Sequence, residues 1–120
     1  MLNLDTHILL HALAGNLTAT ENNLLAGDTW GISDIVIWEI SKLAQLRRIR
    51  IHLNDPVLTR LLSTIQIWPI SLEICRQIGN LDFRGDPADE IIAATSLEHR
   101  TPLVTRDATI RKSRVVPLAP

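Results

Sequence analysis

The sequence predicts an α/β fold in which about four to five parallel strands form a central sheet between two layers of helices. Three observations support this fold class. Short apolar runs alternate with segments of helical spacing, turn and capping residues separate them, and no internal repeat or low-complexity segment interrupts the order. Strands separated by helices form parallel sheets whose right-handed crossovers cover both faces.

Each element has a local signal in the sequence. The apolar runs predict strands at residues 1–5, 28–33, 65–70, 102–105 and 115–118. Helical spacing and start or stop residues predict helices at 7–14, 34–48, after Pro56, 72–79 and 87–99. Ser33 is placed to cap the helix over 34–48, and Pro69 closes the strand over 65–70.

Length and composition indicate one compact domain over residues 1–120. A chain of 120 residues can enclose a hydrophobic core without disulfides or structural metals, and its single cysteine cannot form an intrachain disulfide. The amino-terminal apolar stretch has no cationic region before it and is interrupted by Asp5, which argues against a signal peptide or a membrane span. We therefore expect a soluble, cytoplasmic protein.

Charge is informative through its distribution. The net charge of −1 provides no general attraction to nucleic acid. Ten of the twelve cationic residues are arginines, and the cationic residues gather in two places, one at 47–50 and one at 106–114. Arginine binds phosphate through paired hydrogen bonds, although solvated helix ends are a common alternative explanation for such runs.

A carboxylic acid in an apolar helix is the most unusual feature of the sequence. On a helix over 34–48, Glu39 shares a face with Ile35, Val36, Leu43 and Leu46. Burying an ionised carboxylate without a partner costs several kcal/mol, so Glu39 requires a cation, a hydrogen-bond network or a shifted pKa.

Topology predicts that four acids converge at one edge of the sheet. Asp5 ends the first strand, and Asp107 lies two residues past the strand over 102–105. Glu39 lies in the second turn of a helix that follows a strand, and Asp89 lies in the first turn of a helix that precedes one. Both helices therefore begin at the carboxyl edge, where parallel sheets place their chemistry.

Such a cluster predicts a divalent metal ion. Two like charges about 4 Å apart repel by roughly 4 kcal/mol at an effective dielectric constant of 20, so four carboxylates cannot all stay ionised unaided. Oxygen ligands select Mg²⁺ or Mn²⁺. One or two such ions could hold a phosphodiester and activate a water for in-line attack.

Each acid also has a simpler explanation. Asp86 before Pro87 is most simply a helix N-cap, with Asp89 completing a capping box, although a supporting metal role stays open. Asp5 and Asp107 could be loop acids, and Glu39 could pair with an arginine. The predicted convergence of four acids favours the metal site over these alternatives.

Four stretches in this order resemble the PIN-domain ribonucleases, most closely VapC-type toxins of toxin–antitoxin pairs. They are LDTHILLHAL at 4–13, SDIVIWEISKLAQL at 33–46, GDPADEIIAATSLEHRTPLVTRD at 85–107 and VVPL at 115–118. The resemblance implies a PIN-like three-layer α/β/α fold whose catalytic and metal-binding acids are Asp5, Glu39, Asp89 and Asp107. Thr6 and Thr105 match small hydroxyl residues near that site. Glu90 departs from the family, where close relatives usually have arginine.

The resemblance implies metal-dependent cleavage of RNA, inhibition by a cognate antitoxin and homodimerisation. A housekeeping nuclease without an antitoxin and a catalytically silent metal-binding regulator stay open as alternatives. A third alternative is a phospho-acceptor signalling domain, which also clusters acids at this sheet edge. Such domains need a lysine at the end of a late strand, and the only lysines here are Lys42 and Lys112.

Overall fold

The central sheet consists of four parallel strands. The structure, a computed structural model, describes residues 1–120. The strands are β1 (Leu2–Leu4), β2 (Trp30–Ser33), β3 (Gln66–Trp68) and β4 (Leu103–Val104), in the order β3-β2-β1-β4. Every neighbouring pair is parallel. The predicted fold class is therefore confirmed, with four strands.

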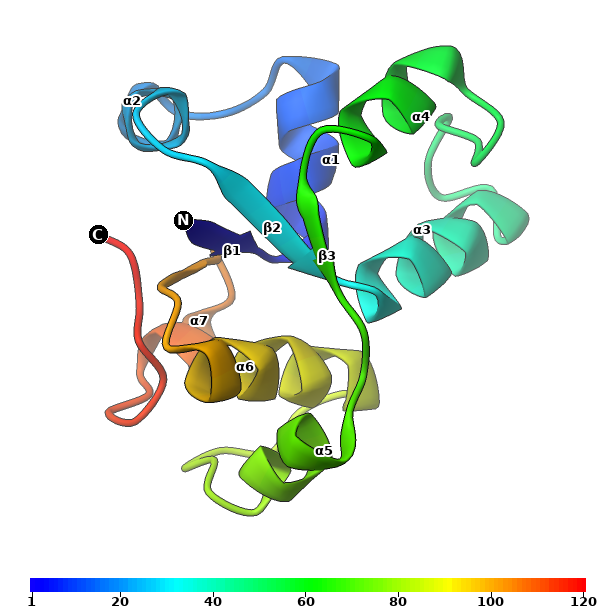
Figure 1. Cartoon of the computed structure of the whole chain (residues 1–120). Coiled ribbons are helices and arrows are strands. Elements are labelled where there is room, and N and C mark those ends of the chain that lie inside the picture. The colour runs from blue at the N-terminus through cyan, green and yellow to red at the C-terminus, as the bar shows by residue number, and fades with distance from the viewer.

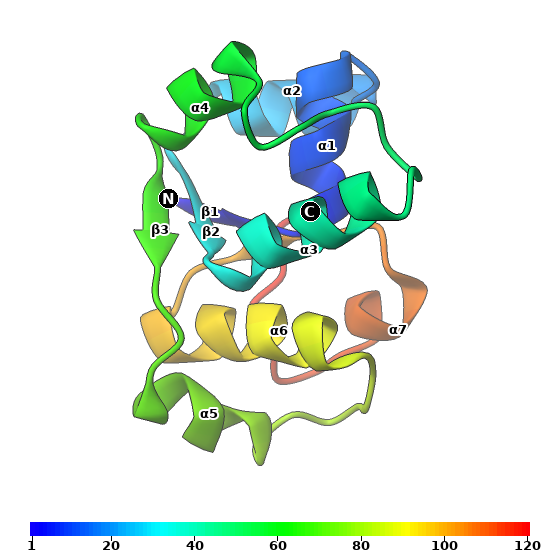
Figure 2. The ribbon, with the colours of Figure 1, turned by 90° about the vertical axis from the view of Figure 1, so that its right-hand side faces the viewer.

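Seven helices surround this sheet. They are α1 (Thr6–Ala14), α2 (Ala19–Ala26), α3 (Ile35–Gln45), α4 (Pro56–Leu62), α5 (Leu72–Ile78), α6 (Pro87–His99) and α7 (Ala108–Arg111). Figures 1 and 2 show α1, α2 and α4 on one side of the sheet and α5, α6 and α7 on the other. Helix α3 lies beyond the carboxyl end of β2, where it contacts both α1 and α6. None of the seven combines the length and apolar character that a membrane crossing requires.

The core explains why the strands are rich in apolar residues. Leu4, Ile32 and Leu103 are fully buried because helices cover both faces of the sheet. Asn3 is a polar residue in the middle of β1, and it has no exposed surface. Its amide donates hydrogen bonds to the Ile92 carbonyl (3.1 Å) and to the Ser96 hydroxyl (2.9 Å), so the side chain ties β1 to α6.

Several local predictions were wrong. The stretch over 115–118 is not a strand, because only one bridge joins Leu118 to Leu103. Helices α2 and α7 were not predicted. The residue at the N-cap of α3 is Asp34 rather than Ser33, although the Ser33 hydroxyl accepts a hydrogen bond from the Ile35 amide (3.2 Å).

The helix predicted over 34–48 also ends earlier, at Gln45. Arg47 adopts a left-handed conformation with φ of 56°, and its amide donates to the Ala44 carbonyl. The Arg48 amide donates to the Leu43 carbonyl. These two bonds form a Schellman motif, which stops the helix and redirects the chain.

Candidate active site

One polar pocket lies at the carboxyl edge of the sheet. It has a volume of about 400 Å³, and no hydrophobic residue lines it. The structure brings together in its wall all four acids that topology selected, and Asp86 as a fifth: Asp5, Glu39, Asp86, Asp89 and Asp107. The pocket therefore collects carboxylates that lie up to about a hundred residues apart in the sequence.

Asp5 is the acid that the fold holds most firmly. It follows β1 directly, caps α1 and is only 5% exposed. Its Oδ1 accepts from the Thr6 amide (2.8 Å), and its Oδ2 accepts from the Thr105 hydroxyl (2.6 Å). The Thr105 hydroxyl also accepts from the Asp107 amide (3.0 Å). Thr105 thus links the acids that follow β1 and β4.

Glu39 is half-buried in the second turn of α3. Its Oε1 accepts a short hydrogen bond from the Thr6 hydroxyl at the start of α1. Val36, one turn earlier, is fully buried, whereas Leu46, predicted on the same apolar face, is 57% exposed. This carboxylate faces the polar pocket and is hydrogen-bonded to Thr6, and no arginine forms an ion pair with it.

Asp89 and Asp86 approach from the start of α6. Asp89 lies in the first turn and accepts no hydrogen bond from the protein. Asp86 occupies the N-cap position, but its side chain makes no capping hydrogen bond, so the predicted capping box is wrong. Because Asn3 fastens α6 to β1, both acids are held near Asp5.

Asp107 closes the pocket beside β4. Its Oδ1 accepts from the Ile110 amide (3.0 Å), which makes Asp107 the N-cap of α7. Its Oδ2 receives no hydrogen bond from the protein. One carboxylate oxygen therefore orients the side chain, and the other stays available.

The electrostatics of the pocket show that the acids interact. Burial, with smaller contributions from the charges of Asp5, Asp107, Glu39 and Asp86, raises the pKa of Asp89 to about 6. Burial also raises the pKa of Glu39, with smaller upward contributions from Asp5 and Asp86, while the Thr6 hydroxyl opposes the shift. The pocket thus penalises negative charge and favours a bound cation.

The donor set suits a hard divalent cation. No three histidine, cysteine, aspartate or glutamate side chains stand in a group that could hold a metal ion. Mg²⁺ keeps several waters and takes only one or two carboxylates directly, so a ready-made cage is not required. Direct binding by all four acids stays a prediction.

Three basic residues complete the pocket wall: His7, His11 and Arg106. In the sequence the two histidines, one helical turn apart, could be taken for a metal pair, but no partner acids are expected near their helix; the five acids in this pocket show that this expectation is wrong. They lie on α1, which begins at the carboxyl edge immediately after Asp5. The position of Asp5 was the signal that could have placed them here.

Arg106 was predicted to contact phosphate, but its guanidinium is already engaged. It donates to both carboxylate oxygens of Glu21 (2.8 and 2.6 Å) and to the Asn16 carbonyl (3.2 Å). The same contact lowers the pKa of Glu21 to about 2. Arg106 therefore fastens α2 to the loop after β4.

The chain matches known proteins over most of its length. The model of the PIN domain family matches residues 3–115. Ribonuclease VapC22 of Mycobacterium tuberculosis is 33% identical over 93 residues, which cover 72% of this chain and 69% of the relative.

Two solved structures share the fold. VapBC2 from Rickettsia felis, bound to a DNA fragment from its promoter, has a TM-score of 0.75 at 23% identity and covers 99% of this chain and 98% of its own. A toxin–antitoxin complex from Klebsiella pneumoniae has a TM-score of 0.73 at 21% identity. The match covers 100% of this chain and 97% of the chain in that complex. The match over residues 3–115 and the VapC22 relative confirm the resemblance found in the sequence: this chain belongs to the PIN domain family.

Proposed function

We propose that this chain is an endoribonuclease that depends on Mg²⁺ or Mn²⁺, and that it is the toxin of a type II toxin–antitoxin pair in the cytoplasm. The observation that carries the proposal is the pocket in which five carboxylates from distant segments meet without any apolar lining. Membership of the PIN domain family and the likeness to a VapC ribonuclease support RNA as the substrate. Residues 1–120 would act as one nuclease domain.

The residues of the pocket would have different roles in metal binding. Thr6 and Thr105 fix the carboxylates of Glu39 and Asp5, which limits the side-chain freedom that metal binding would otherwise remove. Asp89 accepts no hydrogen bond from the protein and can turn toward an incoming ion. Asp107 has one oxygen engaged, so we expect it to act partly through water.

A bound divalent ion would offset the carboxylate charges, take a phosphate oxygen and make a water more acidic. The ligands would come from Asp5, Glu39, Asp89 and Asp107, with Asp86 in support. Their oxygens are of the type that Mg²⁺ and Mn²⁺ prefer. The raised pKa of Asp89 gives this acid the most to gain from a nearby cation.

The proposal is tested by RNA cleavage with the purified chain freed of any partner. Cleavage should require Mg²⁺ or Mn²⁺, stop in chelator, and be lost in Asp5→Asn and Asp89→Asn. Glu73→Gln is a suitable control, because it also removes one carboxylate charge but lies on α5, outside the pocket. Full activity in both pocket variants would end the assignment.

The toxin role predicts a protein antitoxin. The relevant observation is genetic: a small open reading frame for a DNA-binding protein should lie immediately upstream. Induced expression of this chain should arrest growth, and coexpression of that neighbour should restore it. Harmless expression and the absence of such a neighbour would indicate a housekeeping nuclease instead.

We also propose a homodimer, because α3 and the segments beside it expose apolar surface. Trp38, Leu53 and Ile70 are 55%, 41% and 41% exposed, and they line a cavity of about 550 Å³. Contiguous exposed apolar surface of this kind marks interaction sites. Trp38→Ala should shift the mass measured by light scattering toward the monomer, whereas Leu72→Ala, an exposed leucine outside this surface, should not.

The phospho-acceptor alternative requires a lysine beside the acids, and neither lysine of this chain lies there. Lys42 lies on α3, where its amine donates a hydrogen bond to the side chain of Gln45. Lys112 is the C-cap residue of α7. Neither lysine lines the acidic pocket. Labelling of an aspartate by acetyl phosphate is the observation that would favour this alternative again.

A further inference from the structure

A second cavity adjoins the acidic pocket. It has a volume of about 410 Å³, and it shares His7 and His11 with the acidic pocket. The shared histidines form the wall between the two hollows. A ligand held in the acidic pocket can therefore extend over this wall into the second cavity without leaving the surface. We call this second cavity the Arg48 pocket.

The Arg48 pocket has two walls of different character. One wall is a single face of α1, where His7, Leu10, His11 and Ala14 follow at helical spacing. The other wall is the segment 48–51, which alternates arginine and isoleucine. In that segment the two isoleucines are half-buried against the core, whereas the two arginines are exposed. The pocket thus has an apolar floor and a cationic rim.

The cations on this rim are free to bind. Neither Arg48 nor Arg50 forms an ion pair or donates a side-chain hydrogen bond within the chain. In the other cationic segment, Arg106 is held by Glu21, and Arg111 donates to the carbonyls of Thr105 and Ala119. The two cationic segments therefore differ in what they can offer to a ligand.

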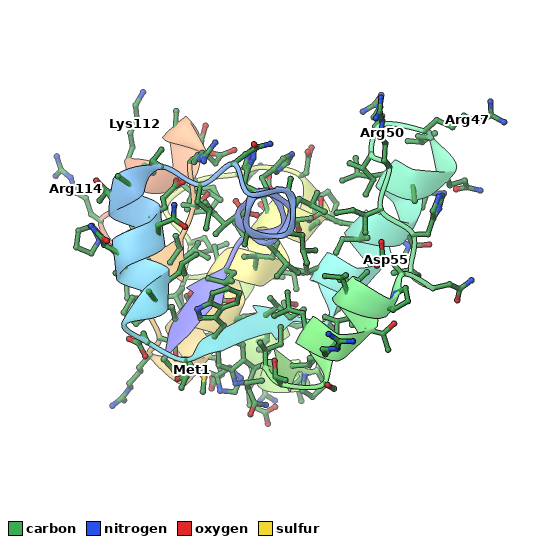
Figure 3. The ribbon with its side chains drawn as sticks, turned by 90° about the horizontal axis from the view of Figure 1, so that it is seen from above. Met1, Arg47, Arg50, Asp55, Lys112 and Arg114 are labelled. Atoms are coloured by element: carbon green, nitrogen blue, oxygen red, sulfur yellow. The ribbon has the colours of Figure 1, made fainter.

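The Schellman motif at the end of α3 sets the direction of the arginine segment. Arg47 stands at the left-handed position that glycine usually takes, and the chain turns there back toward α1. Figure 3 shows Arg47 and Arg50 extending on the side of the molecule opposite to Lys112 and Arg114. The two cationic segments accordingly lie on different faces, which makes one a control for the other.

We propose that the Arg48 pocket is a nucleotide subsite for the RNA substrate. The base of a nucleotide next to the cleaved bond would rest on Leu10, Ile49 and Ile51, and its phosphate would receive hydrogen bonds from Arg48 and Arg50. A cavity of this size can hold a small organic molecule, and arginine rims recognise phosphate. The proposal rests on the proposed function, because the adjoining acidic pocket must hold the cleaved phosphate.

A flexible RNA strand fits these two pockets together better than a peptide does. Its phosphates repeat at every nucleotide, so one can lie in the acidic pocket with its cation while the next meets the arginines. Its bases offer flat apolar faces to the floor between the two charged regions. Neither pocket alone points to RNA. Because the two pockets share a wall, one strand can occupy both, which favours RNA as the ligand.

The test compares two double variants that each remove two cationic side chains. Cleavage of a short, fluorescein-labelled single-stranded RNA of mixed sequence is measured for Arg48→Ala/Arg50→Ala and for Lys112→Ala/Arg114→Ala. In the first variant KM should rise on the order of 10-fold while kcat changes little. The slope of log affinity against log salt concentration should also become shallower by about 0.7, because the two arginines would neutralise one phosphate. The control variant should keep KM and the slope of the unchanged protein.

A third variant tests the base. Ala14→Phe introduces a ring at the exposed end of the cavity without changing charge. It should raise KM for the same RNA, because the ring would occupy space that the base needs; an unchanged KM would contradict the placement of the base in this cavity. Mn²⁺ binding, measured by calorimetry, should be unchanged in all these variants because the acids are intact.

The outcomes separate this proposal from the proposed function. Equal KM values in the two double variants would overturn the subsite while leaving the nuclease assignment in place. The subsite would also be overturned if Arg48→Ala/Arg50→Ala lost binding to a partner protein but kept its affinity for RNA. The pocket would then hold a protein segment. If the unchanged protein fails to cut RNA but binds it through Arg48 and Arg50, the nuclease assignment fails, and the pocket is an RNA-binding site rather than a substrate subsite.

Discussion

Asp89→Asn should make the metal-free protein more stable at neutral pH while weakening its affinity for metal. Burial and the surrounding acids raise the pKa of this carboxyl from 3.8 to about 6. At about 1.4 kcal/mol per pKa unit, the ionised carboxylate would lower the free energy of unfolding by about 3 kcal/mol. The pocket is open to solvent, so screening should reduce this to about 1–2 kcal/mol.

The pH dependence follows from the direction of the shift. The folded protein holds the Asp89 proton more tightly than the unfolded chain, so the stability of the unchanged protein falls as pH rises from about 4 to about 6. The gain from Asp89→Asn should therefore be complete above about pH 6 and absent below about pH 4.

Urea unfolding in chelator measures this difference directly. Experiments at about pH 7.5 and about pH 4 should show a raised midpoint for Asp89→Asn only at the higher pH. Added Mn²⁺ should raise the midpoint of the unchanged protein more than that of the variant, because the ion binds only the folded state. An equal or lower stability of Asp89→Asn at neutral pH would refute the reasoning, as would a gain of the same size at both pH values. Glu73→Gln provides the control for loss of an exposed carboxylate.

Three further substitutions test the fold and the support of the acids. Gly31→Ala would place a methyl group 2.5 Å from the buried ring of Trp68, so we expect a loss of about 1–3 kcal/mol in urea unfolding; an unchanged midpoint would contradict this contact. Arg100→Gly relieves a left-handed residue with φ of 49° at the end of α6 and should raise stability by about 1 kcal/mol, whereas a lower midpoint would argue against that strain. Thr105→Val removes the hydroxyl that orients Asp5 and should weaken Mn²⁺ binding about 10-fold in calorimetry; unchanged affinity would show that the hydroxyl is dispensable.

The approach of the acids could be predicted because it depends on chain direction alone. In a parallel sheet, the end of a strand and the start of the next helix lie at the same edge. Asp5, Glu39, Asp89 and Asp107 each follow from this rule, and the structure places all four in the wall of one pocket. Their chemical roles stay predictions.

Side-chain pairing could not be predicted in the same way. Arg106 and Glu21 are 85 residues apart, and nothing in the local pattern relates them. Helix α2, which carries Glu21, was nevertheless detectable: Thr18 and Glu21 form a complete capping box, whose spacing is visible in the sequence. Missing that signal left α2 out of the predicted helices.

The failed strand over 115–118 has a different cause. Its apolar residues are used in the core, since Val116 is 5% exposed, but Pro117 cannot donate to a neighbouring strand. One bridge to Leu103 is all that forms. Apolar character predicted burial here, and it did not predict the hydrogen bonds of a sheet.

Calorimetric titration of Mn²⁺ into the metal-free protein tests the central claim most directly. The unchanged protein and Glu73→Gln should bind the ion alike, and Glu39→Gln should bind it much more weakly, because the half-buried acid on α3 lines the pocket and the one on α5 does not. Equal affinity in all three proteins would contradict the assignment of the carboxylate pocket as a metal centre.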